Sequence, residues 1–173
     1  MKNETSAHKL LVHEHKKLSS LLREYEKTDD SMDKEDVVQN LAMELHIHMM
    51  LEEQVFFPAL EKEGKAKKLL DDSIKQNDEI KMIIDQLQRL MADQDKKEYD
   101  QKMSELKKCV EHHIEQTECK ILPKAEDAGL DMKQLGSDLC HARDEMTGKK
   151  ITEDTMEVPR NQKQPEIHPD AGA

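Results

Sequence analysis

The fold is indicated first by residues 45–60, which read LHIHMMLEEQVFFPAL. Positions three or four residues apart share one face of a helix, and around this stretch they are Val38, Leu41, Leu45, His48, Glu52 and Val55. An imidazole and a carboxylate therefore lie one turn apart on a face that is otherwise apolar. Because an unpaired carboxylate is costly to bury, this pattern is typical of a helix-bundle core that holds a metal ion.

Three further segments repeat this spacing, and each again carries polar residues where apolar ones belong. Those residues are His15 in the first segment, Asn77 in the third, and His113 with Thr117 in the fourth. Helices joined by short turns run antiparallel, and turns near residues 30, 64 and 94 bring these positions to similar heights, within about one helical turn. The sequence therefore predicts an all-α, up-down-up-down four-helix bundle that is crossed by one polar layer.

The expected helices cover residues 6–27, 33–63, 66–92 and 96–127, with a short fifth helix over residues 132–145 that could pack across the bundle. The run Asp29-Asp30-Ser31 offers turn and cap chemistry before the second helix, and Gly64 should end that helix. Pro58 and Pro123 should each kink their helix or end its regular part.

An internal repeat relates the second and fourth helices. His48 precedes Pro58 by ten residues, and His113 precedes Pro123 by the same interval. This offset places Thr117 at the position that corresponds to Glu52. After Thr147 the composition changes to Lys, Glu, Gln and Pro without an apolar period, so we expect one bundle domain over residues 1–147 and a disordered polar tail over 148–173.

Composition limits the function classes. The 173 residues suit one domain, and a net charge of −11 with 38% charged residues argues against nucleic acid as a partner. No apolar run approaches the roughly 18 residues of a membrane span, and the N-terminus lacks a signal-peptide pattern, so we expect a cytoplasmic protein that does not enter a membrane. Three cysteines without a Cys-x-x-Cys pair favour reduced thiols over disulfides or a thiolate zinc site.

The motifs resemble those of a known family. Residues 45–60 are similar to the second-helix motif of the hemerythrin-like (HHE) cation-binding domain family, and residues 111–123, EHHIEQTECKILP, are similar to its fourth-helix motif. His13-Glu14-His15 resembles the acidic residue and histidine of its first helix. The resemblance covers about residues 7–146, and it implies a four-helix bundle that holds a dinuclear non-haem iron centre.

The resemblance carries over to individual positions. The matching ligand positions are His15, His48, Glu52 and His113, whereas Asn77 stands in place of a third-helix histidine and Thr117 in place of the fourth-helix carboxylate. Glu118, five residues after His113, matches the spacing of the oxygen-carrying hemerythrins. We therefore predict a metal site of His15, His48, Glu52, His113 and Glu118 with a weakened dinuclear centre, which binds one or two ions. Iron suits these ligands, as do Mn(II) and Zn(II).

Three function hypotheses follow. The first is a hemerythrin-like metal-binding protein that binds or senses O2 or NO, or handles iron. The alternative is a metal-free helical interaction module that keeps the inherited geometry. A third, an enzyme that turns over oxygen or nitrogen species, is not favoured, and we assign no catalytic residue, because no proton donor stands out beside the ligands. The remaining histidines His13, His46, His112 and His141 lie beside the helix seams, and His46 and His112 are candidates for supporting or alternative ligands.

Overall fold

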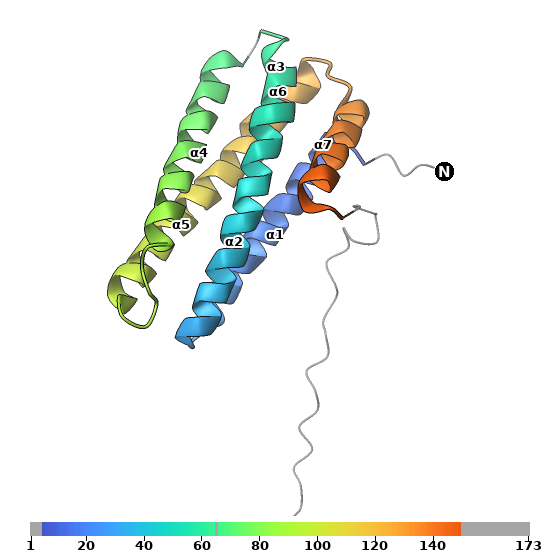
Figure 1. Ribbon diagram of the computed structural model, residues 1–173. Helices are drawn as coiled ribbons and strands as arrows, with labels where there is room; N and C mark the ends of the chain where they lie inside the picture. Colours follow the sequence, from blue (N-terminus) through green and yellow to red (C-terminus); the bar gives the residue numbers. More distant parts are fainter. Residues whose placement is uncertain (1–4, 65, 150–173) are drawn as a thin grey trace, which may run out of the picture.

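The computed structural model describes residues 5–64 and 66–149. Its four long helices are α1 (Ala7–Lys27), α2 (Ser31–Leu51), α4 (Lys67–Leu87) and α5 (Lys96–Gln116). They run alternately up and down, with α4 and α5 side by side and α1 next to α2 (Figure 1). The short helices α3 (Phe57–Glu61) and α6 (Leu122–Asp127) extend α2 and α5. The predicted all-α four-helix bundle is confirmed.

The helix ends follow local capping chemistry. Asp30, as predicted, caps α2, because its carboxylate accepts hydrogen bonds from the backbone N–H groups of Met32 at 2.9 Å and Asp33 at 3.1 Å. Gly64 turns the chain between α3 and α4 with a φ of 68°. The third long helix ends at Leu87, earlier than the predicted residue 92. Tighter turns follow it, with Arg89 N–H bonding the Gln86 carbonyl, and further along the Glu35 carboxylate on α2 accepts a hydrogen bond from the Ala92 N–H at 2.7 Å.

Two π-helical turns interrupt the helices that carry the predicted motifs. They are η1 (Glu52–Phe56) and η2 (Thr117–Ile121), and in each the closing N–H bonds the carbonyl five residues earlier. Each ends just before a proline, Pro58 or Pro123, which lacks an N–H and would clash with the carbonyl four residues before it in a regular helix. The predicted interruption at both prolines is confirmed, and π turns of this kind are frequent at functional sites.

The core consists of two apolar clusters with polar side chains between them. One cluster joins side chains such as Leu18, Leu41, Ile80 and Leu106. The other joins side chains such as Leu10, Leu51, Phe56, Ile121 and Leu139. The polar residues that are at most 1% exposed are His15, His48, Glu52, Ser73, Asn77, His113 and Thr117. This polar layer is the one that the helix seams predict.

The fifth helix, α7 (Met132–Thr147), packs on α1, α2 and η1. Figure 1 shows it along the upper part of α1. Leu135 and Leu139 are buried in the contact, and Gly136 permits close approach, because a Cβ at this position would lie 2.0 Å from the Thr5 carbonyl oxygen. The predicted fifth helix and its packing across the bundle are confirmed.

The predicted tail lies almost wholly outside the described residues, which end at Lys149. Gly148 closes α7 in the left-handed conformation with a φ of 66°. All three cysteines, Cys109, Cys119 and Cys140, carry free thiols. Among residues 5–64 and 66–149, none of the helices combines the length and apolar character that a membrane crossing requires.

Candidate metal centre

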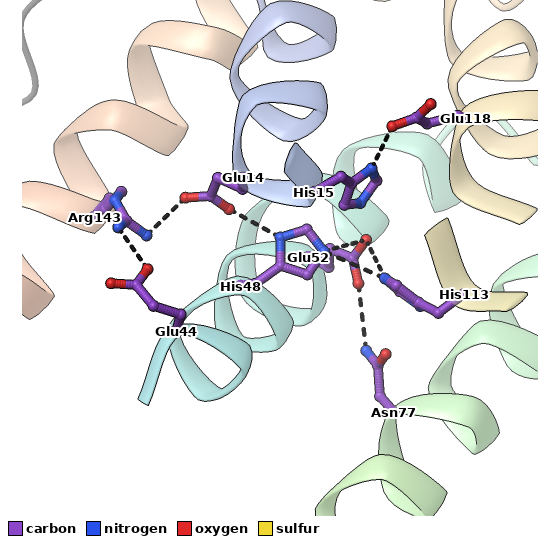
Figure 2. Close-up of polar contacts among 9 residues, drawn as sticks. All are labelled: Glu14, His15, Glu44, His48, Glu52, Asn77, His113, Glu118 and Arg143. Atoms are coloured by element: carbon purple, nitrogen blue, oxygen red, sulfur yellow. Dashed lines mark hydrogen bonds and ion pairs between the residues drawn. The ribbon is translucent and has the colours of Figure 1, made fainter. Parts of the chain in front are cut away.

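Four of the predicted ligands meet in the middle of the bundle. They come from α1 (His15), the α2–η1 junction (His48 and Glu52) and α5 (His113), and one ligand atom of each lies within 4.8 Å of the others. Each of these residues is at most 1% exposed. Figure 2 shows the three imidazoles arranged around the Glu52 carboxylate.

The Glu52 carboxylate is the shared centre of this group. Its Oε1 lies 3.3 Å from Nε2 of His48 and 3.3 Å from Nε2 of His113. The same two Nε2 atoms are 3.3 Å apart. Glu52 and His48 converge because they are one turn apart on the same helix face, whereas His113 reaches them from another helix.

The outer nitrogen of His48 contacts a chain of ion pairs that includes Arg143 on α7. Its Nδ1 lies 2.9 Å from Oε2 of Glu14 on α1. The other Glu14 oxygen accepts a hydrogen bond from Arg143 at 2.7 Å, and Arg143 also donates to Glu44 on α2 at 2.9 Å. Lys17 completes the chain at 2.5 Å from Glu44. A carboxylate on the outer nitrogen fixes the orientation and tautomer of a ligating imidazole, so His48 presents Nε2 to the cluster (Figure 2).

His15 is held in the same way by Glu118. The Glu118 carboxylate lies 2.8 Å from Nδ1 of His15, and its side chain is 36% exposed at the edge of the bundle. It is therefore not among the four residues whose ligand atoms cluster. In this structure Glu118 contacts a predicted ligand instead of joining the cluster, because η2 turns Thr117 inward and leaves Glu118 beside α1.

The two residues that stand in place of family ligands, Asn77 on α4 and Thr117 on η2, carry no charge. The Asn77 amide donates to Glu53 at 3.1 Å and to Oε2 of Glu52 at 3.5 Å. Lys81 pairs with Glu53 at 2.9 Å. Thr117 faces the core from η2, and its hydroxyl has no hydrogen-bond partner among the described residues. Neither replacement supplies an imidazole or a carboxylate.

The pKa values of His15 and His48 are shifted in opposite directions. Burial and the neighbouring His48 lower the pKa of His15 well below its ordinary value. Burial alone would also lower the pKa of His48, but the carboxylates of Glu52 and Glu14 outweigh it and raise that pKa to about 10. Burial would raise the pKa of Glu52, but His113 and His48 lower it well below its ordinary value. These protein groups alone therefore hold an imidazolium–carboxylate pair beside a neutral imidazole.

The donor atoms fit a divalent metal ion. His15 Nε2 and Glu52 Oε1 are buried atoms without a hydrogen-bond partner among the described residues. The outer Nδ1 atoms of His15 and His48 face carboxylates, so their Nε2 lone pairs are available once the Nε2 proton of His48 is displaced. Three imidazole nitrogens and one carboxylate oxygen suit Fe(II), Mn(II) or Zn(II).

Two residues of this arrangement escaped the sequence analysis as functional groups, namely the supporting Glu14 and Arg143. Glu14 is 4% exposed and Arg143 is 9% exposed, both unusually buried for charged residues. In each case the sequence spacing indicated that the side chain is buried. Glu14 follows the buried Leu10 by four residues and Arg143 follows Leu139 by four, which places both on buried helix faces.

The histidines beside the seams lie away from the cluster. His46, His112 and His141 are exposed, and His13 is half-buried. His141 pairs with Glu145 of its own helix at 3.3 Å. Neither His46 nor His112, the two candidates for supporting or alternative ligands, is among the four residues whose ligand atoms cluster in the described part of the chain.

The fold and the centre together define a metal-binding class of four-helix bundle, in which ligands project inward from facing helices. The hemerythrin HHE cation-binding domain model matches residues 6–125 of the chain. The protein therefore belongs to the hemerythrin HHE cation-binding domain family. No curated protein and no solved structure matches the chain. The match ends before α7, so Arg143 reaches the centre from outside the family region.

Proposed function

We propose that the protein binds one non-haem iron ion through His15, His48, Glu52 and His113. The observation that carries this proposal is the convergence of four buried ligand atoms within 4.8 Å of one another. Buried ionisable groups are stable only when they are paired or bound to metal, and His15 Nε2 has no partner of either kind among the described residues. Mn(II) and Zn(II) are the competing ions for this ligand set.

Each residue has a distinct task in this proposal. His15, His48 and His113 supply Nε2 atoms, and Glu52 supplies the negative charge that lies between two of them. Glu14 and Glu118 hold the outer nitrogens of His48 and His15. Iron with an open coordination position supplies affinity for O2 and NO. The two apolar clusters on either side of the polar layer exclude bulk water from the bound molecule.

One ion is favoured over two because the α4–α5 side has lost its ligands. Asn77 and Thr117 are both fully buried, and neither carries a charge. A second divalent ion would therefore find only His113 and a share of Glu52 in this part of the described structure. We predicted Glu118 as a further ligand, and here we propose instead that it positions His15.

The test is the metal content of protein that is produced with ample iron and purified without chelators, measured per chain for Fe, Mn and Zn. We expect about one iron per chain, from a site with four protein ligands. His48→Ala should abolish binding, whereas His46→Ala, an exposed position two residues away on the same helix, should retain it. Equal losses from both variants would contradict the assignment.

Within this proposal the bound iron serves to bind or sense O2 or NO, or to store and deliver the metal itself. Buried ligands without an adjacent catalytic acid support binding over turnover. The nearest phenol on the α1 seam, Tyr25, lies among the residues of the apolar cluster that contains Leu18 and hydrogen-bonds Asp100 instead. A cytoplasmic location and the absence of a nucleic-acid partner stay predictions.

The second candidate is a metal-free helical interaction module, and one observation favours it. His48 lies 2.9 Å from Glu14 and 3.3 Å from Glu52, so protein groups alone already balance its charge. This candidate predicts a stable protein that holds no metal and whose unfolding temperature is indifferent to chelators. The metal measurement therefore decides between the two functions.

A further inference from the structure

A cavity of about 640 Å³ lies between α1, α2 and α7. Its volume is within the range of roughly 300–1,000 Å³ that is usual for small-molecule sites. None of the four clustered residues of the candidate metal centre lines it. The family match ends at residue 125, whereas part of the lining comes from α7 and the residues after it. The cavity is therefore completed by a part of this chain that the family model does not include.

Part of the lining is apolar and adaptable. Leu10 on α1 and Ile47 on α2 are 0% and 8% exposed, so packing holds them in place. The other apolar side chains are methionines, namely Met43 and Met50 on α2 and Met146 on α7. Methionine is unbranched and polarizable, and it adjusts to the shape of what it contacts. This lining fits an apolar body without requiring one exact shape.

The charged part of the lining has more cations than carboxylates. The cations are Lys17, Arg143 and Lys149, and the carboxylates are Glu14 and Glu44. Both carboxylates are already engaged, because Arg143 contacts Glu14 at 2.7 Å and Glu44 at 2.9 Å. No ion pair joins Lys149 to a described residue. In a chain with a net charge of −11, a cavity with an excess of positive charge favours an anionic ligand.

The lining also offers hydrogen-bond donors that the protein does not use. The rings of His13, which is half-buried, and His46, which is exposed, line the cavity and have no hydrogen-bond partner among the described residues. A neutral imidazole keeps one N–H donor. Arg143 donates to Glu14 and Glu44 (Figure 2), and a guanidinium carries more N–H groups than these two contacts use. An acceptor can therefore bind without displacing an existing partner.

We propose that this cavity binds a small carboxylic acid with an apolar body, of the kind that a medium-chain fatty acid represents. Its carboxylate pairs with Arg143 and Lys149, and its apolar body lies against Met43, Met50 and Met146. A planar carboxylate is the acceptor that a guanidinium matches in geometry. A cationic ligand would meet three positively charged side chains, two of which are already neutralised and one of which has no counter-charge among the described residues.

The site borders the candidate metal centre without using its ligands. Glu14 lines the cavity, and its Oε2 lies 2.9 Å from Nδ1 of His48. His48 itself is 1% exposed and does not line the cavity. Binding of the carboxylic acid therefore does not require a metal ion, and the test uses metal-free protein.

The first experiment is a calorimetric titration of the full-length, metal-free chain with three probes at one pH. Octanoate carries both the charge and the apolar body, 1-octanol carries the body alone, and acetate carries the charge with almost no body. We expect octanoate to bind at one site per chain. The affinity for 1-octanol should be at least about tenfold lower, the factor expected for loss of hydrogen bonds to charged groups. Acetate should give no measurable binding.

The cation contact is tested at an exposed position. Lys149→Glu reverses the charge at the edge of the cavity, and it should lower octanoate affinity by about three- to tenfold, as expected for a solvent-exposed ion pair that becomes repulsive. Lys97→Glu is the matched control, because it makes the same change in net charge at an exposed position outside the cavity. It should leave octanoate affinity unchanged.

The apolar contact is tested with a pair of methionines. Met146→Gln keeps the length of the side chain and places an amide in the lining, so octanoate affinity should fall by at least about fourfold, the value of one buried methylene group. Met82→Gln is the control, since Met82 is 62% exposed and outside the cavity. It should bind octanoate as the wild type does.

Four outcomes would overturn the proposal. They are no binding of octanoate, equal affinity for octanoate and 1-octanol, equal losses from Lys149→Glu and Lys97→Glu, and equal losses from Met146→Gln and Met82→Gln. A chain that dimerises and binds no octanoate would assign the cavity to a second copy instead. Metal uptake has no part in these results, so failure of the proposed metal function and failure of this inference are separate.

Discussion

The two halves of the polar layer differ in how their side chains are held. In the α1–α2 half, His15 and His48 each have a carboxylate on the outer nitrogen, at 2.8 Å and 2.9 Å. In the α4–α5 half, His113 Nδ1 has no hydrogen-bond partner among the described residues, and Thr117 has none for its hydroxyl. Ligand support of the first kind is typical of metal sites. The difference indicates that one half retains supported candidate ligands, whereas the other half carries neutral side chains and an unsupported histidine.

The contrast extends to the packing outside each half. The α1–α2 half is backed by α7, whose Arg143 joins Glu14 and Glu44. The α4–α5 half has a neutral pair, Gln76 with Gln116. Its ion pair, Lys81 with Glu53, contacts Asn77 and not a histidine of the cluster. Charged support raises ligand basicity and fixes geometry, whereas neutral support does neither strongly. The following predictions test this comparison, beginning with the largest expected effect.

Loss of the Glu52 carboxylate, which the two halves share, should lower metal affinity most. Glu52→Gln keeps the side-chain shape but removes the charge that lies 3.3 Å from Nε2 of both His48 and His113. Metal affinity, measured by titration of the metal-free protein, should fall more than about 100-fold, beyond the range of supporting residues. Glu53→Gln, at the next position and 28% exposed, is the control and should lose far less. Equal affinity losses would contradict the central role of Glu52.

Restoring the α4–α5 half should change the number of ions. Asn77→His with Thr117→Glu supplies an imidazole and a carboxylate at two fully buried positions. Iron content should rise from about one toward two per chain, because inward-facing carboxylates and histidines of facing helices form two-metal sites in such bundles. Unchanged iron content in a folded double variant would contradict the register assigned to α4 and α5.

The support from α7 should be visible as a loss of affinity. Arg143→Met removes the guanidinium that holds Glu14 at 2.7 Å, which frees the Glu14 carboxylate from its position on His48. Metal affinity should fall by about 10- to 100-fold, the usual effect of losing an outer partner. Arg89→Met is the matched control, since Arg89 is 75% exposed in a surface pair with Asp85. Unchanged affinity together with reduced thermal stability would limit Arg143 to a role in folding.

Replacement of Glu118, the carboxylate that contacts His15, should have a smaller effect on metal affinity. Glu118 is 36% exposed, so water can replace its carboxylate on Nδ1 of His15. Glu118→Gln should weaken metal binding by about tenfold or less, the lower end of the range for outer partners. Glu115→Gln, an exposed position on the same helix, should leave the affinity unchanged. A loss as large as that of Glu52→Gln would show that Glu118 is itself a ligand.

The smallest effect is expected far from the metal. The Tyr25 hydroxyl donates to Asp100 at 2.6 Å, and this hydrogen bond, together with Lys34, lowers the pKa of Asp100 below its ordinary value of 3.8. A lowered folded-state pKa stabilises the protein above pH 3.8, and the stabilisation is lost as the pH falls through the folded value. Asp100 is 43% exposed, so Tyr25→Phe should cost only about 0.5–1 kcal/mol near pH 7.

Denaturant titrations at two pH values check this prediction. The stability difference between wild type and Tyr25→Phe should be present at neutral pH and shrink below pH 3.8, where Asp100 becomes protonated. Iron content should not change, because Tyr25 belongs to the apolar cluster that contains Leu18 and the ligand group does not include it. A difference that grows toward low pH would contradict the assigned direction.

The sequence predicted the bundle and four members of the centre because both depend on local periodicity. His15, His48 and His113 each stand where an apolar side chain would continue a seam, and Glu52 follows His48 by one turn. A residue on a seam must face the core whatever the details of packing. Heights along antiparallel helices then follow from the rise per residue. In the structure, ligand atoms of these four residues lie within 4.8 Å of one another.

The roles of Glu118, Glu14 and Arg143 required the tertiary structure. The direction of Glu118 depends on the π turn η2, which rotates the chain between Thr117 and Ile121. Arg143 is 129 residues from Glu14, and their contact depends on how α7 packs against α1. That packing in turn requires the close approach at Gly136. Periodicity specifies which face of a helix is buried, but it does not specify which neighbour covers that face.

The sequence by itself therefore determined the class of fold, the four buried residues of the candidate metal centre and the burial of Asn77 and Thr117 beside them. The physical reason is that helix geometry converts spacing into a shared face within a few residues. Only the tertiary structure decided that His48 and His15 are anchored by carboxylates, while Ser73, Asn77 and Thr117 share a neutral seam. Such contacts join residues that are distant in sequence, and they depend on the relative rotation and register of whole helices.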